Sequence, residues 1–218
     1  MPEALSRSQR RIVADVMAVV EPDGFVIAGG IALMAAGVSG RPTQHLVALS
    51  PTCDDVALVA ARLVDRLRGS DHLVDVHRCD ATFARMTVST GKYRRTVSVV
   101  ELRRDVQLFE AVSNALGPML SIRELAADKM LAAFGRRGPR DLVDLPSVAD
   151  ATSLRQAVVD ARSKDPGFGR DPFVEMVART MRVRDDLWPE GSEPDAIREF
   201  AHDVLLDPDL FGDHPEFP

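Results

Sequence analysis

The chain has 218 residues, of which 45% are hydrophobic, so it can bury the core of one ordinary domain or of one domain with a small appendage. Its formal net charge is −6, and its two cysteines, Cys53 and Cys79, provide neither a disulfide framework nor metal-ligand spacing. Together with the lack of a signal-peptide pattern or a long apolar run, these features exclude a disulfide-rich scaffold and predict a cytoplasmic protein with no membrane partner.

The first hundred residues predict a small sheet with helices. Apolar residues at helical spacing favour helices over 4–20 and 52–68. Between them an apolar run at 25–28 is typical of a buried strand, and it leads through Gly29-Gly30 into an apolar helix. Two glycines at such a junction are either a tight connection or a place where an anion can approach the backbone. Further strands are expected at 45–49, 73–76, 83–89 and 96–102.

An acidic residue stands near the end of the last of these strands. Alternation along the strand places Val97, Val99 and Glu101 on one face. An acid that points where two valines point is a candidate site residue. The alternative is that Glu101 lies just past the buried part of the strand and is solvated.

After Asp105 the pattern is helical almost to Leu210, with helices expected at 107–115, 121–135, 140–145, 152–162, 171–183 and 194–204. We therefore expect an α+β protein, with a small mixed β-sheet and flanking helices followed by a helical C-terminal half. The expected boundaries are 1–105 for the sheet domain, 106–206 for the helical domain and 207–218 for an acidic tail.

One helical stretch carries charge where apolar residues are expected. Ser121 and Glu124 have the spacing of a capping box, and helical periodicity places Lys129 in the middle of the inward stripe. Pro139 suits the first turn of a second helix, with Asp141 and Asp144 one turn apart. The resulting hairpin is either a binding site or a surface pairing of charges.

The charge of the whole chain is unevenly spread. From position 185 onward there are eleven acids and one basic residue, Arg198. This segment is either a solubilising tail or a cover for a phosphate-binding groove. Elsewhere two basic clusters could hold phosphates, although each alone could be an ordinary solvated surface: Lys92, Arg94, Arg95, Arg103 and Arg104, and Arg136, Arg137 and Arg140.

These motifs, in this order, resemble those of the nucleotidyltransferase-fold toxins of the AbiEii/AbiGii type, which include the mycobacterial MenT toxins. The stronger block reads Glu124-Leu125-Ala126-x-x-Lys129-x-x-Ala132 and continues as Arg137-x-x-Arg140-Asp141-x-x-Asp144. The weaker blocks are Gly29-Gly30-x-Ala32-Leu33 and Arg41-x-Thr43, followed by the strand-end acid Glu101.

The resemblance implies the toxin of a toxin–antitoxin pair, which transfers a nucleotide from a nucleoside triphosphate onto RNA, in MenT-like members the tRNA acceptor end, with Mg²⁺ or Mn²⁺. A triphosphate needs carboxylates to hold the metal and basic groups to steady the phosphates. By resemblance, Lys129, Asp144, Asp141 and Glu101 are the catalytic candidates, with Glu101 as a metal-binding acid. The implied nucleotide-binding residues are Gly29, Gly30, Arg41, Thr43, Arg137 and Arg140.

The chain departs from the family pattern at its metal-binding pair of acids, where it has His45 and Val47. Valine cannot bind a metal, and histidine is a softer ligand than Mg²⁺ prefers. The metal would then be held by His45 and Glu101, or by Glu101 with another acid such as Asp54 or Asp55. Three readings stay open: a transferase, weak or fully active; a degenerate relative that binds nucleotide, RNA or an antitoxin; and a helical interaction domain, which the glycine turn disfavours.

Overall fold

The computed structural model describes residues 5–90, 96–136 and 138–212. The chain divides into two compact units, Met1–Ser121 and Ile122–Pro218. The first unit contains the sheet and the second is helical, so the expected α+β fold class is confirmed. Among the described residues no helix is both long enough and apolar enough to cross a membrane. The basic cluster predicted around Lys92 falls mainly on residues 91–95, outside the described ranges.

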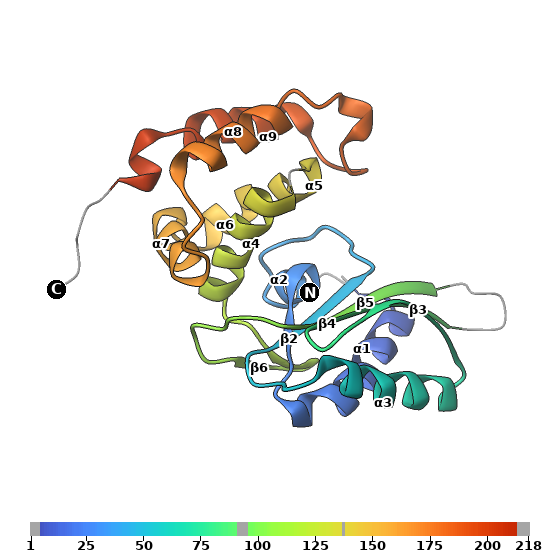
Figure 1. Ribbon diagram of the computed structural model, residues 1–218. Coiled ribbons are helices and arrows are strands. Elements are labelled where there is room, and N and C mark those ends of the chain that lie inside the picture. Colours follow the sequence, from blue (N-terminus) through green and yellow to red (C-terminus); the bar gives the residue numbers. More distant parts are fainter. Residues whose placement is uncertain (1–4, 91–95, 137, 213–218) are drawn as a thin grey trace. The chain divides into compact units, whose positions relative to one another are not determined.

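The first unit is built on a mixed sheet with the strand order β3-β4-β5-β2-β1-β7-β6 (Figure 1). Neighbouring strands are antiparallel except for the β2–β5 and β1–β7 pairs, which are parallel. The strands are β1 (Val26–Ala28), β2 (His45–Ser50), β3 (His72–Cys79), β4 (Phe83–Thr90), β5 (Thr96–Arg104), β6 (Val112–Asn114) and β7 (Gly117–Met119).

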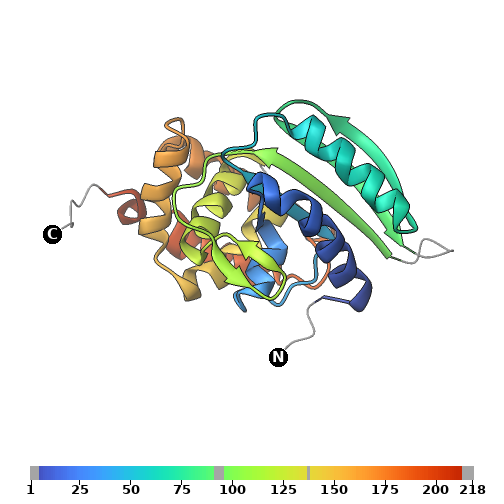
Figure 2. The ribbon, with the colours of Figure 1, turned by 90° about the horizontal axis from the view of Figure 1, so that it is seen from below.

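The α-helices in the described part of this unit are α1 (Arg7–Val20), α2 (Gly29–Ala35) and α3 (Val56–Gly69). Helix α1 starts at a capping box formed by Ser6 and Gln9, and α3 starts at Asp55, whose carboxylate accepts the Ala57 N–H at 2.8 Å. Figures 1 and 2 show α1 and α3 on one side of the strands and α2 on the other. Their apolar stripes bury the core against one sheet face, where Val16 and Leu63 have no exposed surface.

The prediction of a helix at 107–115 is wrong, because a β-hairpin begins within this segment. Val112 of β6 pairs with Met119 of β7, and the Asn114 side chain accepts the Leu116 N–H at 3.1 Å in the turn. Gly117 has φ +121°, a conformation that side-chain-bearing residues rarely adopt. Since β7 also pairs with Ile27 of β1, sheet contacts with residues distant in sequence outweigh the local helical pattern.

The second unit contains the helices α4 (Ile122–Arg136), α5 (Pro139–Leu142), α6 (Leu145–Ala151), α7 (Leu154–Lys164), α8 (Arg170–Thr180) and α9 (Pro194–Phe200). After α9 the chain continues as a short π-helix over Ala201–Leu205 and a 3₁₀ helix over Pro208–Phe211. The main contacts of α4 within this unit are with α7 and α8.

An aromatic cluster forms part of this unit's core. Phe168 lies at centroid distances of 5.3 Å from Phe134, 5.5 Å from Phe173 and 5.7 Å from Phe211. The edge-to-face geometry of the first two pairs is the favoured arrangement for aromatic rings. Phe168 belongs to the connection between α7 and α8, and Phe211 to the segment predicted as an acidic tail, so both segments contribute buried side chains.

Candidate functional site

The glycine turn predicted at the end of the first strand is present, because β1 ends at Ala28 and α2 begins at Gly29. Gly29 has φ +66°, and a Cβ atom there would meet the Val47 side chain at 3.3 Å. A Cβ on Gly30 would meet the Thr43 methyl group at 3.2 Å. The two glycines therefore allow α2 to begin in close contact with the start of β2.

The chain before β2 is held by local and longer hydrogen bonds. Thr43 is buried, its hydroxyl accepts the His45 N–H at 3.2 Å, and its carbonyl accepts a hydrogen bond from Gln9 Nε2 at 2.9 Å. The Arg41 N–H donates to the Ser39 hydroxyl at 3.3 Å. The structure thus brings Gly30 and Thr43 into contact, while the triphosphate-binding role of the glycines, Arg41 and Thr43 stays a prediction.

Glu101 lies on the sheet face opposite α1 and α3. Strand neighbours share a face, and Glu101 pairs with Val47 of β2 on one side and with Arg85 of β4 on the other. Arg103, two residues further along β5, belongs to the same face. We call this surface, carried by Val47, Arg85, Glu101 and Arg103, the Glu101 face. Val97 and Val99 lie on the same face, as strand alternation predicts. Because Val97 is 39% exposed, the Glu101 face is not the face that packs against the core.

Two arginines surround the Glu101 carboxylate. Arg103 Nη2 donates to Glu101 Oε2 at 3.2 Å, and Arg85 Nη1 lies 3.7 Å from Oε1. The exposed fractions of the side chains are 11% for Glu101, 25% for Arg103 and 46% for Arg85. Within the described ranges, the buried Nε atom of Arg103 has no hydrogen-bond partner. The Glu101 face therefore carries two guanidinium groups against one carboxylate.

Sequence reasoning missed Arg85 as a member of this group. Arg85 and Glu101 are brought together by the antiparallel register of β4 and β5, which a single sequence does not specify. The usable signal was the short separation of the strands expected at 83–89 and 96–102, which favours a hairpin. Counting outward from its turn would have placed an arginine of β4 near Glu101.

The residues around Glu101 do not fit the divalent cation that the resemblance implies. The cross-strand neighbour on β2 is Val47, and His45 pairs with Val99 rather than with Glu101. Asp55, one of the substitute acids, caps α3. No group of three or more His, Cys, Asp or Glu side chains is close enough to hold an ion in the part of the chain that the structure describes. Metal binding by His45 and Glu101 stays a prediction.

The charged hairpin predicted in the second unit is present. Lys129 on α4 donates a hydrogen bond through Nζ to the carboxylate of Asp144, the N-cap residue of α6. The side chain of Lys129 is 14% exposed and that of Asp144 is 2% exposed. Asp141, in the short helix α5, is also buried, while Arg140 is exposed. The structure brings Lys129 and Asp144 together, whereas Arg137 lies outside the described residues.

A second charged group on α4 was not expected. Lys164, the last residue of α7, donates to Glu124 at 2.6 Å and also to Asp128. Burial lowers the pKa of Lys164, but the Asp128 and Glu124 carboxylates outweigh burial and raise this pKa above its usual value. Glu124, predicted as half of a capping box, is fully buried and used in this ion pair. Lys164 was missed because it lies 40 residues away in sequence.

Both cysteines are poor candidates for a nucleophile. Burial raises the pKa of the Cys53 thiol and of the Cys79 thiol, which disfavours the reactive thiolate.

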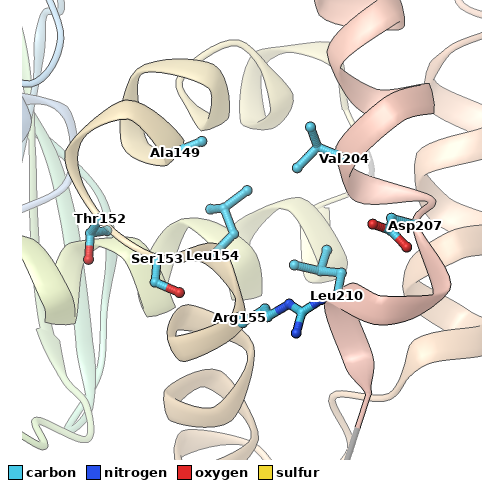
Figure 3. A pocket seen from close by; sticks show the side chains of 8 residues that line it. All are labelled: Ala149, Thr152, Ser153, Leu154, Arg155, Val204, Asp207 and Leu210. Carbon is cyan, nitrogen blue, oxygen red and sulfur yellow. The ribbon is translucent and has the colours of Figure 1, made fainter. Parts of the chain in front are cut away.

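A cavity of about 330 Å³ lies elsewhere in the second unit, between the α6–α7 junction and the C-terminal turns (Figure 3). Leu154, Val204 and Leu210 contribute apolar surface, and Thr152 and Asp207 contribute polar groups. None of the predicted site residues lines this cavity, so it does not add to the candidate site.

The mixed sheet with its flanking helices and the helical second unit match the fold of solved proteins that include an assigned nucleotidyltransferase and the MenT4 toxin. A solved structure of an H. pylori protein assigned as a nucleotidyltransferase matches with a TM-score of 0.60 at 15% identity, covering 89% of this chain and 92% of that one. JHP933 from Helicobacter pylori matches with a TM-score of 0.57 at 17% identity, covering 88% and 85%.

MenT4, a nucleotidyltransferase toxin from Mycobacterium tuberculosis, matches with a TM-score of 0.52 at 19% identity, covering 93% of this chain and 85% of that one. No family model matches the sequence, and a search of curated proteins gives no significant match. At these identities the likeness is one of fold.

Proposed function

We propose that this protein binds a nucleoside triphosphate. The observation that carries the proposal is the Lys129–Asp144 pair, a largely buried ammonium held by a carboxylate within a nucleotidyltransferase fold. A lysine in this setting is fixed in direction and keeps further N–H donors available for phosphate oxygens. The geometry supports binding better than transfer, because the Glu101 face offers one carboxylate and no metal-binding pair of acids.

Specific roles follow for the remaining candidate residues. We assign phosphate contacts to Lys129 and Arg140, with Asp144 and Asp141 as acids that position them. In the first unit, we assign phosphate contacts to the backbone of Gly29 and Gly30, to Thr43, which lies against Gly30, and to the guanidinium group of Arg41. Arg137 belongs to the same proposed group on the grounds of its sequence motif.

A second candidate function adds chemistry to binding: transfer of a nucleotide to RNA, at the tRNA acceptor end, as the toxin of a toxin–antitoxin pair. The likeness to MenT4, a nucleotidyltransferase toxin, favours this candidate. It includes RNA and a cognate antitoxin protein as partners, and Mg²⁺ or Mn²⁺ as cofactor. Because the described residues do not fit a divalent cation site at Glu101, we derive no metal-dependent step from this structure.

Nucleotide binding is tested by titrating each of the four nucleoside triphosphates into the protein and recording heat or thermal shift. We expect Lys129→Ala to weaken binding by roughly tenfold or more, the loss expected for one charge-assisted contact to phosphate. Arg179→Ala is the matched control, since Arg179 forms only an exposed ion pair with Glu175. Binding that is equal in wild type and Lys129→Ala would remove Lys129 from the site, and no binding of any nucleotide would refute the proposal.

Transfer is tested separately by incubating the protein with α-labelled nucleoside triphosphates and total tRNA, with Mg²⁺ or Mn²⁺. Label in tRNA that disappears in Lys129→Ala supports the transferase. A protein that binds nucleotide but labels no RNA under any of these conditions contradicts transfer and leaves the binding function intact.

A further inference from the structure

We propose that the Glu101 face is an anion site, in which Arg85 and Arg103 bind phosphate groups of the nucleotide without a divalent cation. The proposal rests on nucleotide binding as the function and adds where a part of the phosphate chain is held. It also explains the disagreement between the fold and the residues at this position: a guanidinium pair stands where the resemblance implies a metal held by acids.

The first argument is the balance of charge. Glu101 neutralises one positive charge, and within the described ranges Arg85 and Arg103 are the cationic groups whose contacts with it are seen. A guanidinium group is always charged at physiological pH and has five N–H donors. One carboxylate cannot satisfy two such groups, so the pair retains net positive charge and spare donors.

The second argument is an unsatisfied donor. Arg103 Nε is buried and has no hydrogen-bond partner among the described residues, although its Nη2 is held by Glu101 at 3.2 Å. A buried unpaired donor is costly, and such groups in folded proteins normally have a protein, water or ligand partner. A phosphate oxygen is a suitable partner, because the guanidinium fork binds phosphate with two parallel hydrogen bonds.

The third argument is that the neighbouring positions do not repel an anion. The residue beside Glu101 on β2 is Val47, so no second carboxylate faces the arginines from that strand. Arg85 is 46% exposed and approaches Glu101 only to 3.7 Å, which leaves it able to turn toward a ligand. Arg78, the cross-strand neighbour of Arg85 on β3, differs: its guanidinium is bound by Asp80 at 2.8 Å and stacks on the Phe83 ring.

The test compares ATP and inorganic tripolyphosphate as probes, each titrated into the full chain in EDTA and again in Mg²⁺. The variants are Arg85→Gln, Arg103→Gln and Glu101→Gln. Arg104→Gln is the matched control, because Arg104 is the next residue of β5, is exposed and points to the opposite side of the sheet. Thermal unfolding of each variant shows whether it is folded.

We expect binding of both probes in EDTA, weakened by roughly tenfold in Arg85→Gln and Arg103→Gln and unchanged in Arg104→Gln. Glu101→Gln should bind more tightly than wild type, since it removes the negative charge that competes with the anion. A merely structural arginine pair would not give this opposite sign. If Arg103→Gln fails to fold, Arg85→Gln and Glu101→Gln carry the test.

Three outcomes separate this inference from the proposed function. ATP binding that requires Mg²⁺, or that is insensitive to both arginine substitutions, overturns the anion site while nucleotide binding stands. Arginine-dependent binding of tripolyphosphate without any binding of nucleotides supports the anion site and refutes the proposed function. Failure of tripolyphosphate and of all four nucleoside triphosphates to bind refutes both.

Discussion

Two clusters of charged side chains, one in each unit of the molecule, have the same arrangement with opposite signs of charge. On the Glu101 face, one carboxylate lies between two guanidinium groups, those of Arg85 and Arg103. Beside α4, one ammonium, that of Lys164, lies between the carboxylates of Glu124 and Asp128. Their accessibility differs: the central Lys164 is 3% exposed and Glu124 is fully buried, whereas Arg85 is 46% exposed.

This difference separates a structural ion cluster from a candidate binding site. Lys164 uses its donors on two acids inside the second unit, and it connects the end of α7 to the first turns of α4. The arginines retain donors, including the unpaired Nε of Arg103. Burial with complete pairing therefore indicates a role in stability, while partial exposure with an excess of one charge indicates a role in binding.

The largest effect is expected at Lys164. Lys164→Met keeps the apolar length of the side chain but removes the ammonium group that lies between two carboxylates, one of them fully buried. Breaking a buried ion pair in this way costs about 3–5 kcal/mol of unfolding free energy. Urea denaturation at pH 7 measures the loss. The triple variant Lys164→Met with Glu124→Gln and Asp128→Asn should recover much of it, since the two acids that the ammonium group neutralises are neutral as well. A triple variant as unstable as the single one would contradict this account.

The pH dependence of this cluster follows from the raised pKa of Lys164. A lysine whose pKa is higher in the folded state than in the unfolded state stabilises the protein fully below the unfolded pKa, near 10.5. That stabilisation is lost as pH rises through the folded value. The stability difference between wild type and Lys164→Met should therefore be constant from pH 7 to about 9.5 and shrink above about 10.5. A difference that changes near neutral pH would implicate another group.

The next effect is expected at Lys129. Lys129→Met removes one partner of Asp144, which is 2% exposed, but the Lys129 side chain is itself 14% exposed. We expect a loss of about 2 kcal/mol, below that of Lys164→Met because residual solvent can reach the pair. Urea denaturation of both variants in parallel gives the order. Equal losses would place Lys129 with the structural cluster and weaken its assignment to nucleotide binding.

Local sequence patterns were sufficient for several parts of the fold and the candidate site. The Gly29-Gly30 turn follows directly from an apolar strand and an apolar helix on either side. The Lys129–Asp144 pair spans 15 residues of one helical hairpin, so periodicity and a helix-starting proline place both groups. Features of this kind depend on neighbours in sequence, which a single chain shows.

The remaining parts depend on contacts between distant residues. The hairpin at Val112–Met119 forms because β7 pairs with β1, and its sequence resembles a helix when read alone. Lys164 and Glu124 meet only when α7 packs on α4. The Arg85–Glu101 contact requires the register of two strands. A shift by one residue would move Arg85 to the other face, and composition does not decide between the two.

The smallest effect is expected at Glu101, and it provides the sharpest check on the comparison. Glu101→Gln removes the charge that the two arginines share, but the arginines are 25% and 46% exposed and remain solvated. We expect a change in unfolding free energy within about 1 kcal/mol, as for other partly exposed ion pairs. The glutamine amide oxygen can still accept a hydrogen bond from Arg103, so this contact is kept. A loss as large as that of Lys164→Met in the same urea series would show that Glu101 is a structural counter-ion, and the Glu101 face would then belong with the Lys164 cluster.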